Sequence, residues 1–429
     1  MSRLLVRNGR VIDPAQGLDQ VLDVLIEDGR ISRLGKDLQR GADISEFDAE
    51  GLIVAPGFID LHAHLREPGF EYKETIETGC MAAAAGGFTA VCCMANTSPV
   101  NDEPAVTRYI MEKAQRAGAV RVYPIGALSK GCQGEALAEV GEMVQAGAVA
   151  ISDSPNPVAN PLLLRRALEY CRSFDVPIIV HPQDEALSDR GTMNEGRVST
   201  RIGLRGMPAA AEEMVVARDI LLAGYTGGRL HLGHLSTAGS VEAVRAAKAR
   251  GSKVTCEVTA HHFSLIDEDV AAADYDPQWK MNPPLRTQED RQAVIDGIAD
   301  GTIDAIVSDH APHHQDENEM DFADAPFGIT GLETAVSLAL DRLVRPGIIE
   351  ISALIRLMSV APSKIVGVPG GCLEVGSPGD LTILDLERSV TVDPGAFVSK
   401  GRNTPFGGFT LQGGPAATVV GGRIVWQQR

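Results

Sequence analysis

The chain has 429 residues, of which 44% are hydrophobic and 22% charged, so it can bury a large core. Its formal net charge of −18 argues against a general nucleic-acid binder and against a protein that binds anionic membrane surfaces. No apolar run is long enough to span a membrane, and the first residues lack the pattern of a signal peptide, so we expect neither.

The two ends of the chain alternate apolar and polar residues, which is typical of half-buried strands. Short turn sequences between such runs indicate hairpins. We expect N-terminal strands at 4–11, 21–27 and 30–35 with turns at Asn8-Gly9 and Asp28-Gly29, and C-terminal strands at 381–385 and 418–426 with a turn at Gly421-Gly422. We therefore predict a small discontinuous β-sandwich built from residues 1–55 and 369–429.

The middle of the chain repeats one pattern eight times: an apolar run, a polar loop and a segment of helical period. The expected strands are 58–61, 88–94, 120–126, 148–152, 177–180, 230–235, 254–258 and 303–307. Strands that alternate with helices predict a parallel sheet, and eight units favour a (β/α)8 TIM barrel over residues 56–368. An open doubly wound α/β sheet is the alternative, but no Gly-x-Gly-x-x-Gly follows any strand.

The first barrel strand ends in Asp60-Leu61-His62-Ala63-His64. Side chains two residues apart in a strand point the same way, so His62 and His64 present two imidazoles together. Neutral imidazole is a common metal ligand. If this pair belongs to a metal site, further ligands must follow other strands, because the active sites of such barrels lie at the C-terminal strand ends.

Further candidate ligands do follow the other strands. They are Asp153 after the fourth strand, His181 after the fifth, His234 after the sixth and Asp309 after the eighth. Taken singly, His181 could be a buried core histidine and Asp153 could cap a loop. We interpret His231, His261 and His262 as structural or packing residues. As a set, the candidates indicate a nitrogen- and oxygen-rich site suited to Zn²⁺, with manganese or cobalt as substitutes.

A divalent metal lowers the pKa of a bound water, and a neighbouring carboxylate can accept and return its proton. Asp309 is the candidate acid/base, and the predicted chemistry is hydrolysis or closure of an amide-like bond. Arg66 follows the histidine pair and can clamp a carboxylate; pairing with Glu67 at the surface is the alternative. Asn96 and His313 follow strands two and eight as further donors, and residues 315–323 read as a mobile loop that can exclude water.

These motifs resemble the dihydroorotases, cyclic amidohydrolases of the amidohydrolase superfamily, and in particular the bacterial type with an aspartate at its metals. The resemblance covers essentially the whole chain. Its strings are DLHAHLREPG from Asp60, KETIETG from Lys73, KMNPPLR from Lys280, SDHAPH from Ser308, APFGI from Ala325 and KGRNTPF from Lys400.

The resemblance implies roles at matching positions. His62 and His64 would bind one metal and His181 and His234 a second, with Asp309 as ligand and acid/base. Substrate contacts would come from His64, Arg66, Asn96, Asn282, His313, Phe327 and Gly328. The implied reaction is reversible cyclisation of N-carbamoyl-L-aspartate to L-dihydroorotate in pyrimidine synthesis, with one or two Zn²⁺ per chain.

One position departs from the family pattern. The family carries Asp-Asp-Gly after strand four, with the second aspartate bridging the metals, whereas this chain has Asp153-Ser154-Pro155. A neutral hydroxyl is a poor substitute for a bridging carboxylate. Either Asp153 takes over the bridging position, or the site holds one metal firmly and the other weakly.

Two other functions compete with this interpretation. Hydantoinases and allantoinases typically place a carboxylated lysine after strand four, but the nearest lysines here are Lys130 and Lys248. A catalytically inactive homologue that supports aspartate transcarbamoylase would tend to lose ligands that this chain keeps. We also expect a homodimer, possible association with aspartate transcarbamoylase and, from seven scattered cysteines, a cytoplasmic location.

Overall fold

The structure is a computed structural model that describes residues 3–39 and 44–428. Eight parallel strands, in chain order around the sheet, form a barrel. A parallel bridge between Ala63 and His310 joins its last strand to its first. The strands are β6 (Phe58–Ala63), β7 (Phe88–Cys93), β8 (Arg121–Gly126), β9 (Ala150–Ile151), β10 (Ile178–Val180), β13 (Leu230–Leu232), β14 (Val254–Thr259) and β15 (Ala305–Val307). The predicted (β/α)8 TIM barrel is confirmed.

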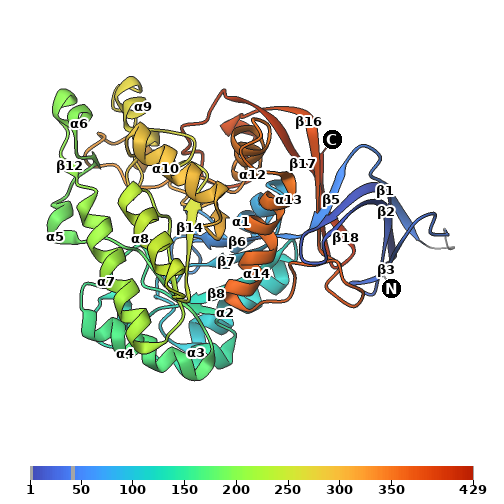
Figure 1. Cartoon of the computed structure of the whole chain (residues 1–429), viewed down its shortest axis with the longest axis horizontal. Coiled ribbons are helices and arrows are strands. Elements are labelled where there is room, and N and C mark those ends of the chain that lie inside the picture. Colours follow the sequence, from blue (N-terminus) through green and yellow to red (C-terminus); the bar gives the residue numbers. More distant parts are fainter. Residues whose placement is uncertain (1–2, 40–43, 429) are drawn as a thin grey trace.

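Helices surround the barrel (Figure 1). Several begin after side chains that cap them: Thr75, Asn160, Thr237 and Thr287 each accept a backbone N–H of the first helical turn. The helices are α1 (Ile76–Ala85), α2 (Pro104–Ala117), α3 (Val140–Ala146), α4 (Pro161–Cys171), α7 (Ala210–Thr226), α8 (Ala238–Ala249) and α10 (Gln288–Ala299), followed by α12 (Ala335–Ala339), α13 (Ile351–Ile355) and α14 (Ala361–Val366).

Short elements lie in the loops that follow the strands. Between β10 and α7 the chain forms a small two-stranded sheet, β11 (Met193–Asn194) with β12 (Gly206–Met207), together with α5 (Glu185–Ser188) and α6 (Arg197–Ile202). Helix α9 (Asp267–Ala272) follows β14, and α11 (Gln315–Asn318) follows β15. In Figure 1, α6, β12 and α9 stand beyond the barrel at the upper left. None of these short elements was predicted from the sequence.

Segments from both ends of the chain form one further sheet beside the barrel (Figure 1). Its strands are β1 (Arg3–Asp13), β2 (Leu18–Glu27), β3 (Arg30–Gly35), β4 (Ser45–Asp48), β5 (Ile53–Pro56), β16 (Leu381–Thr391), β17 (Thr410–Val420) and β18 (Arg423–Gln427). Strand β5 pairs with β16, so the N- and C-terminal parts join directly. Buried side chains of β1, β2, β16 and β17 share one apolar cluster.

The turn predictions at the chain ends had two outcomes. Asp28-Gly29 connects β2 to β3, and Gly421-Gly422 connects β17 to β18, as expected. Asn8-Gly9 is not a turn between strands: it lies within β1, where the pairing with β2 shifts register and Asn8 has a φ of 59°. This is a β-bulge, which uses the same left-handed residues as a turn. The domain boundaries at residues 55 and 368 stay predictions.

Candidate active site

The C-terminal ends of the barrel strands surround a pocket of about 400 Å³. Eleven of the twelve predicted site residues line it: His62, His64, Arg66, Asn96, His181, His234, Asn282, Asp309, His313, Phe327 and Gly328. Asp153 is the exception. Residues that are separated by more than 260 positions in the chain therefore meet in one cavity, because each follows a strand of the same barrel.

His62 and His64 lie side by side, with ring centroids 5.6 Å apart. Nε2 of each ring is 3.7 Å from Oδ1 of Asp309. One nitrogen of each histidine and one oxygen of Asp309 fall within 4.8 Å of one another, and all three side chains are buried. This cluster has the ligand types and the spacing that a divalent metal ion requires.

Each histidine of this pair is oriented through its other nitrogen. Nδ1 of His62 donates to Glu257, at 2.7 Å, and Nδ1 of His64 donates to Oδ1 of Asn96, at 2.8 Å. The second oxygen of Glu257 bonds His231, at 3.0 Å. These bonds direct Nε2 of both rings towards Asp309, and metal-binding histidines are oriented in the same way through their other nitrogen.

The charges around Asp309 set its protonation. Burial opposes ionisation of this carboxyl group, but His62, His64 and His234 together hold its pKa well below its usual range. Burial also opposes a charge on His62, yet the carboxylates of Asp309 and Glu257 raise its pKa to about 9. Burial prevails at His64 and lowers its pKa to about 4. Asp309 is therefore a carboxylate at neutral pH, able to accept a proton.

A second pair of histidines lies beside the first, with the rings of His62 and His234 5.1 Å apart. Nδ1 of His181 and Nε2 of His234 are 2.9 Å apart, and the rings meet edge to face. Nε2 of His181 bonds Oε1 of Gln183, at 2.7 Å, and Asn282 donates to the same oxygen, also at 2.7 Å. Two imidazole nitrogens that converge in this way either share one proton or face the same cation, so this pair also suits a metal.

The structure does not bring Asp153 into the site. One of its oxygens accepts the backbone N–H groups of Leu128 and Ser129, and the other accepts the Ser129 hydroxyl. Both oxygens are thus used to hold the loop after β8. Ser154 lines the pocket instead, with its hydroxyl 3.4 Å from Nε2 of His62. We therefore remove Asp153 from the predicted ligands; its carboxylate has not moved to the bridging position.

Three predicted site residues have strained backbone. Arg66, His234 and Asp309 have φ values of 63°, 30° and 47°, in the left-handed region that most residues avoid. Such conformations cost free energy and persist only where the surroundings impose them. Here they turn the chain directly after β6, β13 and β15, which brings these side chains into the pocket.

One wall of the pocket carries the predicted carboxylate-binding groups. Nε of Arg66 donates to the carbonyl of Pro312, at 3.1 Å, and its terminal nitrogens have no partner among the described residues. Nε2 of His313 donates to the carbonyl of Phe327, at 2.8 Å. Burial, with Arg66 and Lys73 nearby, lowers the pKa of His313 to about 2, so the ring is neutral. The guanidinium is therefore the charged group available to an anion.

The acidic segment that we predicted to be mobile lies beside this wall. It contains α11, whose Glu317 forms an ion pair with Lys73, at 2.7 Å. Nζ of Lys73 is also 3.4 Å from Nδ1 of His313. The loop after β6 and the loop after β15 are thus joined beside His313, which lines the pocket.

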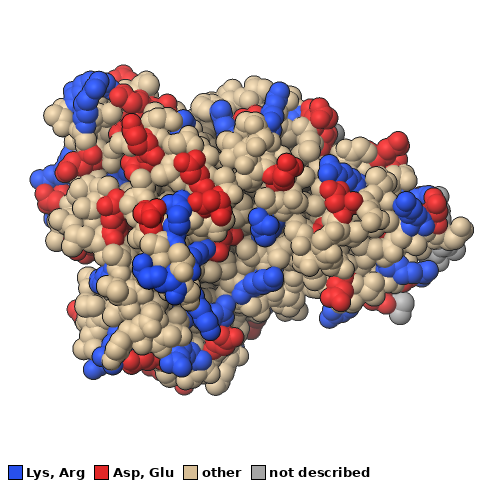
Figure 2. All heavy atoms as spheres, viewed as in Figure 1, with Lys and Arg blue, Asp and Glu red and all other residues tan. Residues whose placement is uncertain are grey.

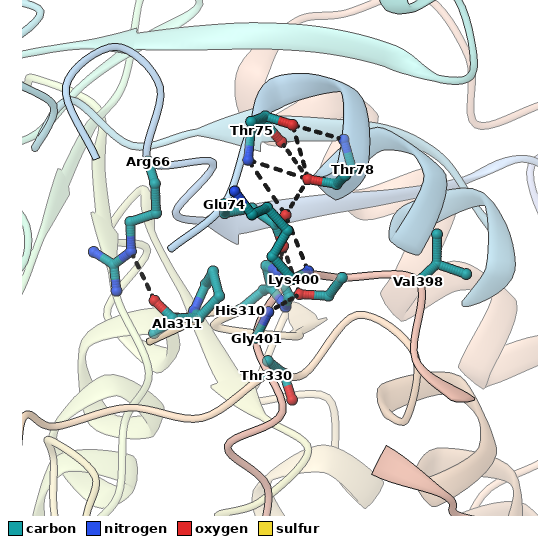
Figure 3. A network of polar contacts seen from close by, with 12 residues as sticks. Arg66, Glu74, Thr75, Thr78, His310, Ala311, Thr330, Val398, Lys400 and Gly401 are labelled. Atoms are coloured by element: carbon teal, nitrogen blue, oxygen red, sulfur yellow. Dashed lines mark hydrogen bonds and ion pairs between the residues drawn. The ribbon is translucent and has the colours of Figure 1, made fainter. Parts of the chain in front are cut away.

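A buried network supports the turn after β15. Glu74 accepts from His310, at 3.2 Å, and from the hydroxyls of Thr78 and Ser399 (Figure 3). Figure 3 also shows the segment from Val398 to Gly401 passing beside His310. His310 follows Asp309 directly, so the C-terminal part of the chain helps to fix the position of the candidate acid/base.

Comparison with known proteins identifies the family. The chain is 54% identical over 425 residues to a dihydroorotase of Syntrophotalea carbinolica and 50% identical over 425 residues to one of Geobacter metallireducens, and each alignment covers at least 99% of both chains. A family model described as dihydro-orotase-like matches residues 51–240. The chain belongs to the dihydroorotase family.

Solved structures agree with this assignment at the level of fold. An L-hydantoinase (dihydropyrimidinase) from Arthrobacter aurescens superposes with a TM-score of 0.89 at 25% identity, over 100% of this chain and 96% of that one. A dihydropyrimidinase from Brevibacillus agri gives 0.86 at 22% identity. The dihydroorotase family thus shares its barrel and its flanking sheet with other cyclic amidohydrolases, and this chain is an enzyme of that group.

Two residues that bond predicted ligands, Glu257 and Gln183, were not among the predicted site residues. Glu257 is a charged residue within the apolar run of β14, and a carboxylate in a buried strand is a signal that it has a buried partner. Gln183 follows His181 by two residues, and His64 follows His62 by the same spacing, which indicates side chains that point the same way. Both act on predicted ligands rather than entering the pocket as ligands themselves.

Proposed function

We propose that this protein catalyses the reversible cyclisation of N-carbamoyl-L-aspartate to L-dihydroorotate in pyrimidine synthesis. One observation carries the proposal: a single pocket contains both a cluster suited to a metal, His62, His64 and Asp309, and the guanidinium of Arg66. A cyclic amide that also bears a carboxylate matches both halves of that pocket.

We propose Zn²⁺ as the resident metal. The donors are imidazole nitrogens and a carboxylate, without cysteine, which suits zinc and admits manganese or cobalt. His62, His64 and Asp309 would hold the first ion, and His181 with His234 a second. Because Ser154 stands at the bridging position and Asp153 is bound elsewhere, we propose that the first ion is held firmly and the second weakly.

A bound divalent ion would act as a Lewis acid on the attacking water and on the scissile carbonyl. Asp309 accepts the proton of that water during ring opening and delivers it to the ring nitrogen as the carbon–nitrogen bond breaks. In the direction of cyclisation Asp309 takes a proton from the ureido nitrogen and returns it to the departing water. Its lowered pKa supplies the ionised form that must start the ring-opening direction.

The remaining pocket residues orient the substrate. Arg66 faces the pocket with its terminal nitrogens and is proposed to bind the carboxylate of dihydroorotate in a bidentate manner. Oδ1 of Asn96 is used by His64, which leaves its amide nitrogen for the same carboxylate. Asn282, Phe327 and Gly328 line the part of the pocket where the ring would lie.

The first experiment is ring opening of L-dihydroorotate by the purified protein, with bound metal counted in the same sample. We expect turnover with about one firmly bound zinc per chain. Turnover of hydantoin or allantoin instead would contradict the proposed substrate. Bound metal without any turnover would contradict the proposed function, and neither metal nor turnover would indicate a scaffold protein.

We propose a cytoplasmic homodimer that does not bind nucleic acid and that can associate with aspartate transcarbamoylase. All seven cysteines are unpaired, as in proteins of reducing compartments. Among the described residues no helix is long and apolar enough to cross a membrane. Figure 2 shows acidic and basic side chains interspersed on one face of the molecule, and the net charge is −18. Sedimentation of the protein, alone and with aspartate transcarbamoylase, tests both assemblies.

A further inference from the structure

A segment near the C-terminus, residues 399–404, packs against the carboxylate-binding wall of the pocket. It belongs to the string that begins at Lys400, to which the proposed mechanism gives no role. Figure 3 shows Lys400 and Gly401 close to His310 and Thr330. The segment lies between β16 and β17 of the flanking sheet, so it reaches the site from outside the barrel.

Asn403 connects this segment to both loops of the wall. Its Oδ1 accepts the backbone N–H of His313, at 3.0 Å. Its Nδ2 donates to the carbonyls of Ala311, at 2.9 Å, and Gly328, at 3.0 Å. The side chain is 2% exposed. One amide thus holds the loop that carries His313 together with the loop that carries Phe327 and Gly328.

Gly401 allows this segment to lie close to the wall. A Cβ atom on Gly401 would lie 2.6 Å from Cβ of Pro312 and 3.0 Å from Oδ1 of Asn403, which is closer than side chains pack. The backbone carbonyl of Asn403 also accepts from Thr330, at 2.8 Å for the backbone N–H. Gly401 therefore allows the contact that the Asn403 amide completes.

This contact bears on substrate binding rather than on the metal cluster. The carbonyl of Pro312 accepts a hydrogen bond from Arg66, and His313 and Gly328 line the pocket. The hydrogen bonds of Asn403 therefore fix the backbone next to the groups that are proposed to bind the carboxylate and the ring of the substrate. The amide has no hydrogen bond to His62, His64 or Asp309. A shift of this wall would weaken binding of the anionic substrate while leaving the metal ligands in place.

We infer that Asn403 is a positioning residue for substrate recognition. Its hydrogen bonds to the backbone of His313 and Gly328 fix the position of these two residues in the carboxylate-binding wall. The inference rests on the proposed function, because it concerns the proposed binding site of dihydroorotate. It adds a part of the C-terminal segment to an active site otherwise built from the barrel.

The test compares wild type with Asn403→Ala, Gly401→Ala and the control Asn194→Ala. Asn194 is a buried asparagine that also has several polar partners, Asp267 and Arg286, but lies in β11 away from this wall. For the Asn403→Ala and Gly401→Ala variants we expect KM for L-dihydroorotate to rise about tenfold or more, with a much smaller change in kcat and unchanged metal content. The control is expected to lose thermal stability without a change in KM.

Binding of orotate, measured by calorimetry, provides a readout that does not need turnover. We expect its Kd to rise about as much as KM does. The inference is overturned if orotate binds both variants within about twofold of wild type, or if Asn194→Ala raises KM equally. A wild type that binds orotate without opening dihydroorotate would contradict the proposed function alone, because the comparison of orotate affinities would still test Asn403.

Discussion

Asp309 is placed by its neighbours as much as by its own position in the chain. His62 and His64 approach one of its oxygens to 3.7 Å, while Glu257 and Asn96 hold those rings from behind. Its neighbour His310 is fixed by Glu74. A carboxylate held so firmly among histidines remains ionised and can transfer protons without moving far.

Replacing Asp309 with asparagine removes the proton acceptor but keeps the side-chain shape. We expect kcat for ring opening to fall about a thousandfold or more, with an unchanged circular dichroism spectrum. The matched control is Asp316→Asn, because that carboxylate is exposed on α11. Turnover retained by Asp309→Asn would contradict the acid/base assignment.

We propose that Ser154 limits the number of metal ions that the site holds. Its hydroxyl is 3.4 Å from Nε2 of His62, and Asp153 has not taken the bridging position, since it bonds the loop after β8. We expect Ser154→Asp to raise the metal content from about one to about two ions per chain, measured by elemental analysis after dialysis. Ser154→Ala serves as the control and should bind as wild type does. Equal metal content in all three proteins would contradict this account.

Among the elements, helix α7 contains a buried charge that has no role in the site. Asp219 is fully buried; one carboxylate oxygen accepts from Arg218, at 2.7 Å, and the other has no partner. Burial raises the pKa of Asp219 to about 6, although Arg218 acts in the opposite direction. The folded protein therefore holds this proton at pH values where the unfolded chain has lost it.

The sign of the resulting pH dependence follows from this shift. Between pH values of about 4 and 6 the folded state binds more protons at Asp219, so stability falls as the pH rises through that range. We expect Asp219→Asn to be more stable than wild type at pH 7.5, by up to about 3 kcal/mol, and the difference to shrink towards pH 4. Chemical denaturation at both pH values measures it, with the exposed Asp189→Asn as control; a pH-independent difference would contradict the assignment.

The elements differed in how well the sequence predicted them. The barrel strands were recognised because strands buried on both faces read as continuous apolar runs. The pair β11 and β12 was missed because each strand has only two residues, too few to show a period. Asn8-Gly9 was misread as a turn because a bulge and a hairpin turn use the same residue types.

In the molecule as a whole, the flanking sheet and the barrel share buried polar contacts. The Thr382 hydroxyl donates to the carbonyl of Gly87, at 2.7 Å, and accepts the N–H of Phe58, at 2.9 Å. Arg121 of β8 forms two bonds with Asp380 just before β16, at 2.6 and 3.0 Å. The sheet therefore closes one end of β6 and β7, while its loop at residues 399–404 reaches the pocket.

Because these contacts are shared, we expect sheet and barrel to unfold together, in a single calorimetric transition. Thr382→Val leaves two buried backbone groups without a partner and should lower the free energy of unfolding by about 1–3 kcal/mol. Thr391→Val, at an exposed position of β16, should change it little. Two separate transitions in wild type would contradict the expected coupling.

The sequence by itself determined the barrel, the pocket-lining histidines, Asp309 and Arg66, because each follows an apolar run and parallel strands of a barrel end on one face. It also revealed Ser154 at the position where the resemblance implies an aspartate. Only the tertiary structure decided that Asp153 bonds the loop after β8, that Glu257 bonds His62, and that Asn403 bonds the loops of His313 and Gly328. These contacts join side chains to loops that are far apart in the sequence. Neither the hydrophobic periodicity nor the spacing of residues along the chain predicts which loops come into contact.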